Sequence, residues 1–261
     1  MTNQNQADQK EEKQRKPRSD VGPRITERDQ AALRWIAQQY AVRLDHLQVV
    51  LARLLNEQQR AKLKEEGKLT ERRAQDVVDR WVTLGLVKTR YFLAGEPPWI
   101  WVSAEGLTFL HLQPQMRYYE PKPATLAHLH ACNQARLAYP RLERERRQRQ
   151  GMPAPEGMTW KGEREIRAEQ EPLSKGQKPP HLPDAIVVTT GQAVTAIEVE
   201  LTMKTYARLD RILRDLAANQ RYTAIWYFTP SKVKIALDRV VSKLPESFHE
   251  KFVTCDLEQL E

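Results

Sequence analysis

Two glutamates interrupt an apolar run in the C-terminal half of the chain, and their spacing constrains the fold more than any other feature. The run is AVTAIEVELT at residues 193–202, with Glu198 and Glu200 separated by one residue. Successive side chains of a β-strand point to opposite faces. Both carboxylates therefore share one face and the apolar residues share the other, which predicts a strand with a buried face and an acidic end.

A second strand is expected beside this one. The apolar run AIVV follows Asp184, and a tight-turn signal at residues 191–192 lies between the two runs. Antiparallel pairing through that turn places Asp184 across from Glu198 and Glu200. Lys204 follows at the expected junction of strand and helix, where its ammonium could hold an attacking water or a phosphate. The predicted catalytic residues are Asp184, Glu198, Glu200 and Lys204.

Carboxylates that lie side by side in apolar surroundings repel one another and lose hydration. A divalent cation offsets both costs, and ligands that are all oxygen suit Mg²⁺ or Mn²⁺. The predicted metal ligands are Asp184, Glu198 and Glu163. The alternative for Glu198 and Glu200 is the solvated face of an edge strand.

Two further groups near these carboxylates are open to two interpretations. Residues 158–169, MTWKGEREIRAE, are expected to form a strand with Glu163 and Glu165 on one face. Either glutamate could add a carboxylate to the metal ligands, and the alternative is an ordinary surface position. His181 is either a neighbour of the metal ligands or a loop histidine. The other histidines show no ligand spacing.

Strand and helix patterns alternate through the rest of the C-terminal half. A long helix at about residues 124–150 precedes them, and its polar second half is expected to be exposed. The order αβββαβ, followed by one further αβ unit, predicts an α/β domain. After the long helix, the expected strands and helices are residues 158–169, 184–190, 193–202, 205–218, 222–229, 231–244 and 251–257. In the helix at 205–218 the side chains expected to face inward include Tyr206.

The N-terminal half has a different pattern. Three helices are expected from a cap at Thr26, from about residue 43 and from Thr70, and a β-hairpin at residues 86–102 follows them. Three helices and a hairpin are typical of a winged helix, which is a variant of the helix-turn-helix. The predicted fold class is thus an α+β winged-helix domain followed by an α/β domain. The predicted boundaries are a disordered polar arm at 1–24, the winged helix at 25–120, a long helix and linker at 121–157, and the α/β domain at 158–261.

The third helix is the expected reader of double-stranded DNA. Its outward positions include Asp76 and Asp79, which do not suit phosphates. These aspartates could accept from cytosine amino groups, pair with nearby arginines or face a protein partner. Arginine and glutamine suit base edges, and Arg and Lys suit phosphates. The predicted DNA-binding residues are Arg72, Arg73, Gln75 and Arg80 on this helix, Lys88 and Arg90 on the hairpin, and Arg208, Arg211 and Arg214 on the helix after Lys204.

Charge and cysteine content are consistent with this interpretation. The 261 residues include 42 Lys and Arg against 34 Asp and Glu, a net charge of +8 that favours a polyanionic partner. Cys132 and Cys255 are the only cysteines, which fits a reducing compartment. No apolar run approaches the roughly 20 residues that cross a bilayer, and the polar N-terminus has no signal-peptide core. We therefore predict a cytoplasmic protein, for which the long charged helix could form a homodimer contact.

Three blocks of sequence carry a resemblance to a known family. They are Trp160 through Glu163, the run HLPD at 181–184, and the run AIEVELTMK at 196–204. Asp184, Glu198 and Lys204 on an αβββαβ core resemble the PD-(D/E)xK nuclease superfamily, although Glu200 occupies the position where that superfamily has its lysine. The combination with a winged helix is similar to the replication-relaxation family of plasmids and other mobile elements. The resemblance covers most of residues 25–256 and is specific in the third block.

The resemblance implies a DNA-binding protein that acts in replication, DNA relaxation or gene control of a mobile element, with a nuclease-like C-terminal domain. Two alternatives remain open at the level of sequence. The first is an active endonuclease or nickase dependent on Mg²⁺ or Mn²⁺. The second is an adaptor that recruits a relaxase or a replication initiator, in which the outward aspartates form part of a protein interface.

Overall fold

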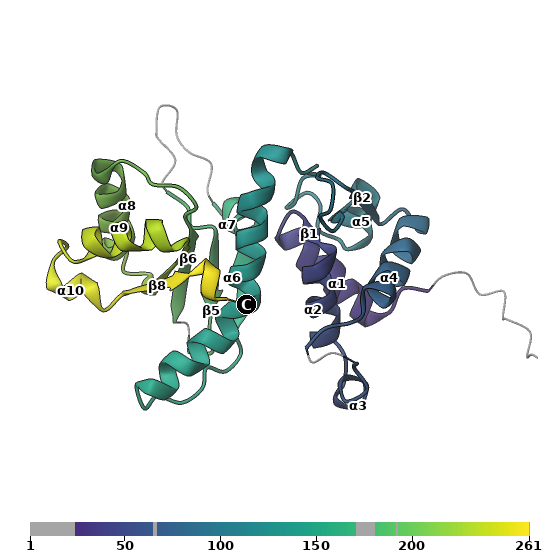
Figure 1. The fold of residues 1–261 in the computed structure, drawn as a ribbon, viewed down its shortest axis with the longest axis horizontal. Coiled ribbons are helices and arrows are strands. Elements are labelled where there is room, and N and C mark those ends of the chain that lie inside the picture. Colours follow the sequence, from purple (N-terminus) through teal and green to yellow (C-terminus); the bar gives the residue numbers. More distant parts are fainter. Residues whose placement is uncertain (1–23, 65–66, 171–180, 192, 261) are drawn as a thin grey trace, which may run out of the picture.

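The structure, a computed structural model, describes residues 24–64, 67–170, 181–191 and 193–260. Over these residues the chain is a mixed α and β protein with ten α-helices and two sheets (Figure 1). A three-stranded sheet belongs to the N-terminal part and a five-stranded sheet to the C-terminal part. We call residues 24–122 the N-terminal module and residues 123–260 the C-terminal module.

Helices surround a small antiparallel sheet in the N-terminal module. Its sheet has the order β1-β3-β2. Helix α1 begins with the capping box predicted at Thr26, whose hydroxyl accepts from the backbone N–H of Asp29 at 3.2 Å. The elements are α1 (Glu27–Gln38), β1 (Val42–Arg43), α2 (Leu44–Arg53), α3 (Glu57–Arg60), α4 (Glu71–Thr83), β2 (Val87–Arg90), β3 (Trp99–Val102) and α5 (Ala104–Phe109).

The buried face of α4 is the one predicted from its apolar spacing. Ala74, Val77, Val78 and Trp81 are all buried. Asp29 of α1 is completely buried beneath this helix and accepts from Arg80 at 2.6 Å and from the Trp81 indole at 3.2 Å. The capping carboxylate of α1 thus also attaches α4 to the module.

Two helical layers enclose the sheet of the C-terminal module. Its order is β4-β5-β6-β7-β8, antiparallel from β4 to β6 and parallel from β6 to β8. Helices α8 and α9 pack on one face and α6 on the other. The elements are α6 (Pro123–Arg149), β4 (Thr159–Gly162), α7 (Glu163–Ala168), β5 (Ala185–Val188), β6 (Val194–Val199), α8 (Tyr206–Ala218), β7 (Tyr222–Thr229), α9 (Ser231–Val241), α10 (Glu246–His249), β8 (Phe252–Asp256) and a 3₁₀ turn (Leu257–Gln259).

Helix α6 contributes to the cores of both modules. Near its start, Leu126 and Leu129 pack against Trp99 and Trp101 of the N-terminal sheet. Further along, Tyr139 packs with the five-stranded sheet, together with Ala131 and Ala135. Figure 1 shows this helix between the two modules. The segment predicted to be a long helix and linker therefore begins with a helix that packs against both modules.

Three expectations about local structure were wrong. The run at 158–169 forms a strand only to Gly162 and then the short helix α7, so Glu163 and Glu165 lie in the first helical turn. Tyr206, expected to face inward, is 50% exposed because it occupies the first turn of α8 beyond the sheet edge. Glu143, in the polar half of α6, is buried, because Arg146 and Arg147 both pair with it at 2.8 Å.

Some expectations fall outside the described residues. The predicted arm lies almost wholly in residues 1–23, and Gln192 of the predicted turn is also outside. Among the residues that are described, no helix has the length and apolar character needed to cross a membrane.

Candidate active site at the sheet edge

Asp184 and Glu198 lie across from each other at one end of the five-stranded sheet, where β5 begins and β6 ends, and we call this end the sheet edge. Strands β5 and β6 pair with Ala185 opposite Ile197, so Asp184, one residue before β5, lies across from Glu198. The backbone N–H of Val199 donates to Oδ2 of Asp184 at 2.7 Å. This bond fixes one oxygen of the carboxylate and leaves the other, Oδ1, directed at helix α6. The pairing predicted from the period of the strand is the pairing found.

Glu198 is a buried carboxylate in a central strand, which excludes the alternative of a solvated edge. Its exposed fraction is 6%, and His181 Nε2 lies 2.8 Å from Oε1. Burial raises the pKa of Glu198 to about 7, the nearby Asp184 charge adds to this shift, and the hydrogen bond with His181 opposes it. The same hydrogen bond raises the pKa of His181. The hydrogen bond thus couples the protonation of Glu198 to that of His181.

Glu200 and Lys204 form an ion pair just beyond the end of β6. The backbone N–H of Glu200 donates to the carbonyl of Phe228 at 3.0 Å, which continues the sheet by one residue. Lys204 lies within electrostatic reach of Glu198 and Asp184. Glu200, which occupies the position expected for a lysine, therefore pairs with Lys204, four residues later in the chain.

Glu163 reaches the same edge from α7. Its backbone N–H donates to the carbonyl of Asp184 at 2.9 Å. Its carboxylate accepts from the Tyr40 hydroxyl at 3.1 Å and pairs with Arg167. Glu165 has a different role, since it accepts from the backbone N–H of Gly162 at 3.0 Å and from Gln38 at 3.1 Å. Of the two glutamates, only Glu163 lines the cavity beside Asp184. The ligand atoms of the predicted set Asp184, Glu198 and Glu163 do not all lie within 4.8 Å of one another in the structure.

Two side chains of α6 complete the site, and neither was predicted from the sequence. His128 Nε2 lies 3.1 Å from Asp184 Oδ1, and Cys132 Sγ lies 3.5 Å from the same nitrogen. The hydrogen bond to Asp184 raises the pKa of His128. Residues four apart share a helix face, so the spacing of this pair was a usable signal. What the sequence did not reveal is that this face of α6 meets Asp184.

A cavity of about 300 Å³ opens among these groups and continues between the modules. The N-terminal module supplies part of its wall, including Tyr40, whose backbone has a positive φ of 67°. The residues that line it are Gln38, Gln39, Tyr40, Tyr119, Thr125, His128, Leu129, Cys132, Glu163 and Asp184. Both modules therefore shape the space next to the carboxylates.

The predicted DNA-binding residues lie outside this site. Arg72 and Arg73 are exposed on α4. Gln75 donates to Asp79 at 2.7 Å within that helix, and Arg80 is engaged by the buried Asp29. An arginine held by a buried carboxylate has a structural role, which weakens the prediction for Arg80.

The remaining predicted contacts lie on β2 and on α8. Lys88 and Arg90 are exposed on β2 and lie over the rings of Tyr118 and Phe92, at 5.1 and 5.2 Å from the ring centroids. On α8, Arg208, Arg211 and Arg214 are exposed along one face, and Arg214 pairs with Asp210 at 2.9 Å. Figure 1 shows α4 and α8 on opposite sides of α6. The basic groups thus form two separate surfaces.

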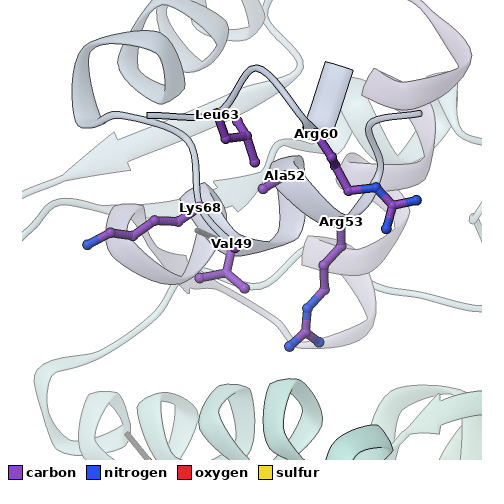
Figure 2. Close-up of a pocket in the computed structure, with 7 residues that line it drawn as sticks. Val49, Ala52, Arg53, Arg60, Leu63 and Lys68 are labelled. Atoms are coloured by element: carbon purple, nitrogen blue, oxygen red, sulfur yellow. The ribbon is translucent and has the colours of Figure 1, made fainter. Parts of the chain in front are cut away.

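A basic hollow of about 630 Å³ lies on the N-terminal module beside α2 and α3 (Figure 2). Arg53, Arg60 and Lys68 surround an apolar floor that includes Val49 and Leu63, and none of the described residues that line it is acidic. In Figure 2, Arg53 and Arg60 extend on one side of Val49 and Lys68 on the other. This hollow was not foreseen from sequence, because its cations are spread over three segments.

Comparison of the chain with protein-family models, with curated proteins and with solved structures gave no match. The assignment of function therefore depends on the residues and their geometry.

Proposed function

We propose that this protein binds double-stranded DNA and that its C-terminal module holds a divalent cation at the sheet edge, as in the PD-(D/E)xK nucleases. The observation that carries the proposal is the meeting of Asp184 and the buried Glu198, on adjacent strands, with Lys204 in electrostatic reach. The antiparallel β4-β5-β6 unit followed by α8 and the parallel strand β7 supports the comparison with that superfamily.

The N-terminal module, in this proposal, is a winged helix. The order β1-β3-β2 behind α4 supports it, since the β2-β3 hairpin then forms the wing. Arg72, Arg73 and Gln75 of α4 would contact the major groove, and Lys88 and Arg90 would contact phosphates. Arg80 is assigned to the module's core instead. The basic hollow with Arg53 and Arg60 gives a further surface of the charge that phosphates require.

In this proposal the cation is Mg²⁺ or Mn²⁺, and the three predicted carboxylates would have to draw closer together to bind it jointly. Asp184, Glu198 and Glu163 offer carboxylate oxygens, the ligands that such cations prefer. The raised pKa of Glu198 supports the fit, because a buried carboxylate next to another is stabilised in its charged form by a cation. When bound, the cation would polarise the scissile phosphate.

DNA cleavage is the second candidate function, and the position of Lys204 favours it. Held by Glu200, its ammonium is available to orient a water towards a phosphate. His181 could pass a proton to or from Glu198 through the hydrogen bond of 2.8 Å that joins them. Arg208 and Arg211, exposed on the following helix, would contact the DNA backbone near the site.

The biological setting follows from the sequence resemblance. In this proposal the protein acts in the replication, DNA relaxation or gene control of a plasmid or other mobile element. A third candidate, an adaptor for a relaxase or a replication initiator, is favoured by the exposed Asp76 and Asp79 on α4. Binding of DNA separates this adaptor from the other two.

Titration with duplex DNA at two salt concentrations tests the proposal. We expect binding that weakens steeply with salt, since each phosphate contact releases a counterion. Arg72→Ala should weaken it, whereas Arg141→Ala, on the exposed side of α6, should not. Absence of binding at low salt would exclude both DNA functions and favour the adaptor.

An assay with supercoiled plasmid distinguishes DNA binding alone from DNA cleavage. The protein is incubated with the plasmid and with Mg²⁺ or Mn²⁺, beside Asp184→Ala and Glu198→Ala. Relaxed or linear product from the wild-type chain alone supports cleavage at this site. No product with either cation favours DNA binding without cleavage, and equal product from the two variants refutes the proposed site.

A further inference from the structure

His128, Cys132 and Asp184 form a cluster whose chemistry differs from the all-oxygen site. The imidazole and the thiol lie one helical turn apart on α6, and the carboxylate reaches them from the start of β5. One potential ligand atom from each residue lies within 4.8 Å of the other two. Helix residues four apart can hold one ion from a single face, as in the two histidines of the H-E-x-x-H motif.

The distances in the cluster suit ligands of one ion. Bonds from zinc are about 2.1 Å to nitrogen or oxygen and about 2.3 Å to sulfur. At a tetrahedral angle these lengths separate nitrogen from oxygen by about 3.4 Å and sulfur from nitrogen by about 3.6 Å. In the structure, His128 Nε2 lies 3.1 Å from Asp184 Oδ1 and 3.5 Å from Cys132 Sγ. Small side-chain movements would bring all three atoms to bonding distance.

The surroundings favour a cation at this position. Glu163 and Glu198 add negative charge that acts on both His128 and Cys132. The cavity of about 300 Å³ lies directly beside the cluster, so a fourth coordination position is open. Three protein ligands and one open position are the arrangement of catalytic rather than structural zinc. The backbone is also fixed there, since Gln39 donates to the carbonyl of Cys132 at 3.2 Å.

We propose that His128, Cys132 and Asp184 bind a transition-metal cation of the zinc class at the wall between the modules. Imidazole and thiolate are poor ligands for Mg²⁺ and good ligands for Zn²⁺. The position is distinct from the site made by Glu163, Asp184 and Glu198, and Asp184 is common to both. Occupation by zinc would engage the oxygen Oδ1 of Asp184 and thereby compete with Mg²⁺ or Mn²⁺ for that carboxylate.

Cobalt is the probe for the test, because Co²⁺ takes the place of Zn²⁺ and absorbs visible light. The full-length protein, freed of metals by a chelator, is titrated with Co²⁺ in the absence of DNA. We expect ligand-field bands and a thiolate-to-cobalt charge-transfer band at one cation per chain. Added Zn²⁺ should bleach both, and an equal concentration of Mg²⁺ should not.

Variants assign the ligands. Cys132→Ser should abolish the charge-transfer band, and His128→Gln should weaken Co²⁺ binding at least tenfold, the scale on which loss of even an outer partner acts. His130→Gln, on another face of α6 where it stacks on His46 at 4.6 Å, and Cys255→Ser are matched controls that should bind as the wild-type chain does. Circular dichroism confirms that each variant is folded.

Two outcomes would overturn the inference. One is a folded wild-type chain that gives no cobalt bands, and the other is a charge-transfer band that survives in Cys132→Ser. Both are independent of the proposed DNA binding, since no DNA is present. A chain that binds Co²⁺ and not DNA refutes only the proposed function, and a chain that binds DNA and not Co²⁺ refutes only this inference.

Discussion

Replacing Glu198 by glutamine should stabilise the protein at alkaline pH and leave its stability nearly unchanged in acid. The pKa of this buried carboxyl is raised from 4.5 to about 7, so the folded state binds its proton more tightly than the unfolded state does. Below pH 4.5 both states are protonated and Glu198 contributes no pH dependence. Between pH 4.5 and 7 the unfolded state ionises first and the free energy of unfolding falls.

The size of the effect follows from the same pKa. At about 1.4 kcal/mol for each pKa unit, the ionised carboxylate costs about 3 kcal/mol above pH 7. Glu198→Gln keeps an acceptor for His181 and removes the charge, so its advantage over the wild-type chain should grow to about that value at pH 8. His181, whose pKa is also raised by its hydrogen bond with Glu198, adds a pH dependence of its own. Comparison of His181→Gln with the double variant His181→Gln/Glu198→Gln therefore measures the effect of the Glu198 carboxyl alone on the free energy of unfolding.

Urea unfolding followed by circular dichroism, in chelator and at pH values from 4 to 8, measures the difference. Glu246→Gln, an exposed glutamate of the same module, is the matched control and should give a difference that does not vary with pH. A difference for Glu198→Gln that is flat across this range would refute the reasoning. So would a variant that is less stable than the wild-type chain at pH 8.

Three further predictions concern the rest of the structure. Addition of Mn²⁺ at pH 8 should raise the melting temperature of the wild-type chain more than that of Glu198→Gln, and calorimetry that finds equal shifts would place the cation elsewhere. Asp29→Ala should cost about 3 kcal/mol in urea unfolding, because it leaves Arg80 without its buried partner, whereas the exposed Arg73→Ala should stay within about 0.5 kcal/mol. Gly162→Ala should lower the melting temperature, since its Cβ would lie 2.5 Å from the carbonyl oxygen of Gln38; an unchanged melting temperature would show that the modules separate easily.

The central part of the candidate site could be predicted from sequence because it depends on local rules. Strand period puts Glu198 on a face opposite its apolar neighbours, and a short connection forces the neighbouring strand to return beside it. Those two rules place Asp184 across from Glu198, as the register confirms. The inward face of α4 was predictable for the same reason, since helical spacing alone selects Ala74 and Trp81.

The rest depended on contacts between distant segments. His128 touches Asp184 across 56 positions of sequence, and no local pattern specifies which helix face meets the sheet edge. The strand predicted at 158–169 was too long, because the alternating pattern continues past Gly162. In the structure the carbonyl of Asp184 accepts the N–H of Glu163, and a helix begins there. Arg80 looked available for DNA because its partner, Asp29, belongs to another helix.

The position of α6 limits how this protein can be divided. Leu126 and Leu129 cover Trp99 and Trp101, while Tyr139 on the same helix packs in the larger sheet. A chain cut before α6 would expose two indole rings, and a chain that begins with α6 would carry an uncovered apolar surface at its start. The two modules are therefore expected to fold as a pair, because one helix contributes to the core of each.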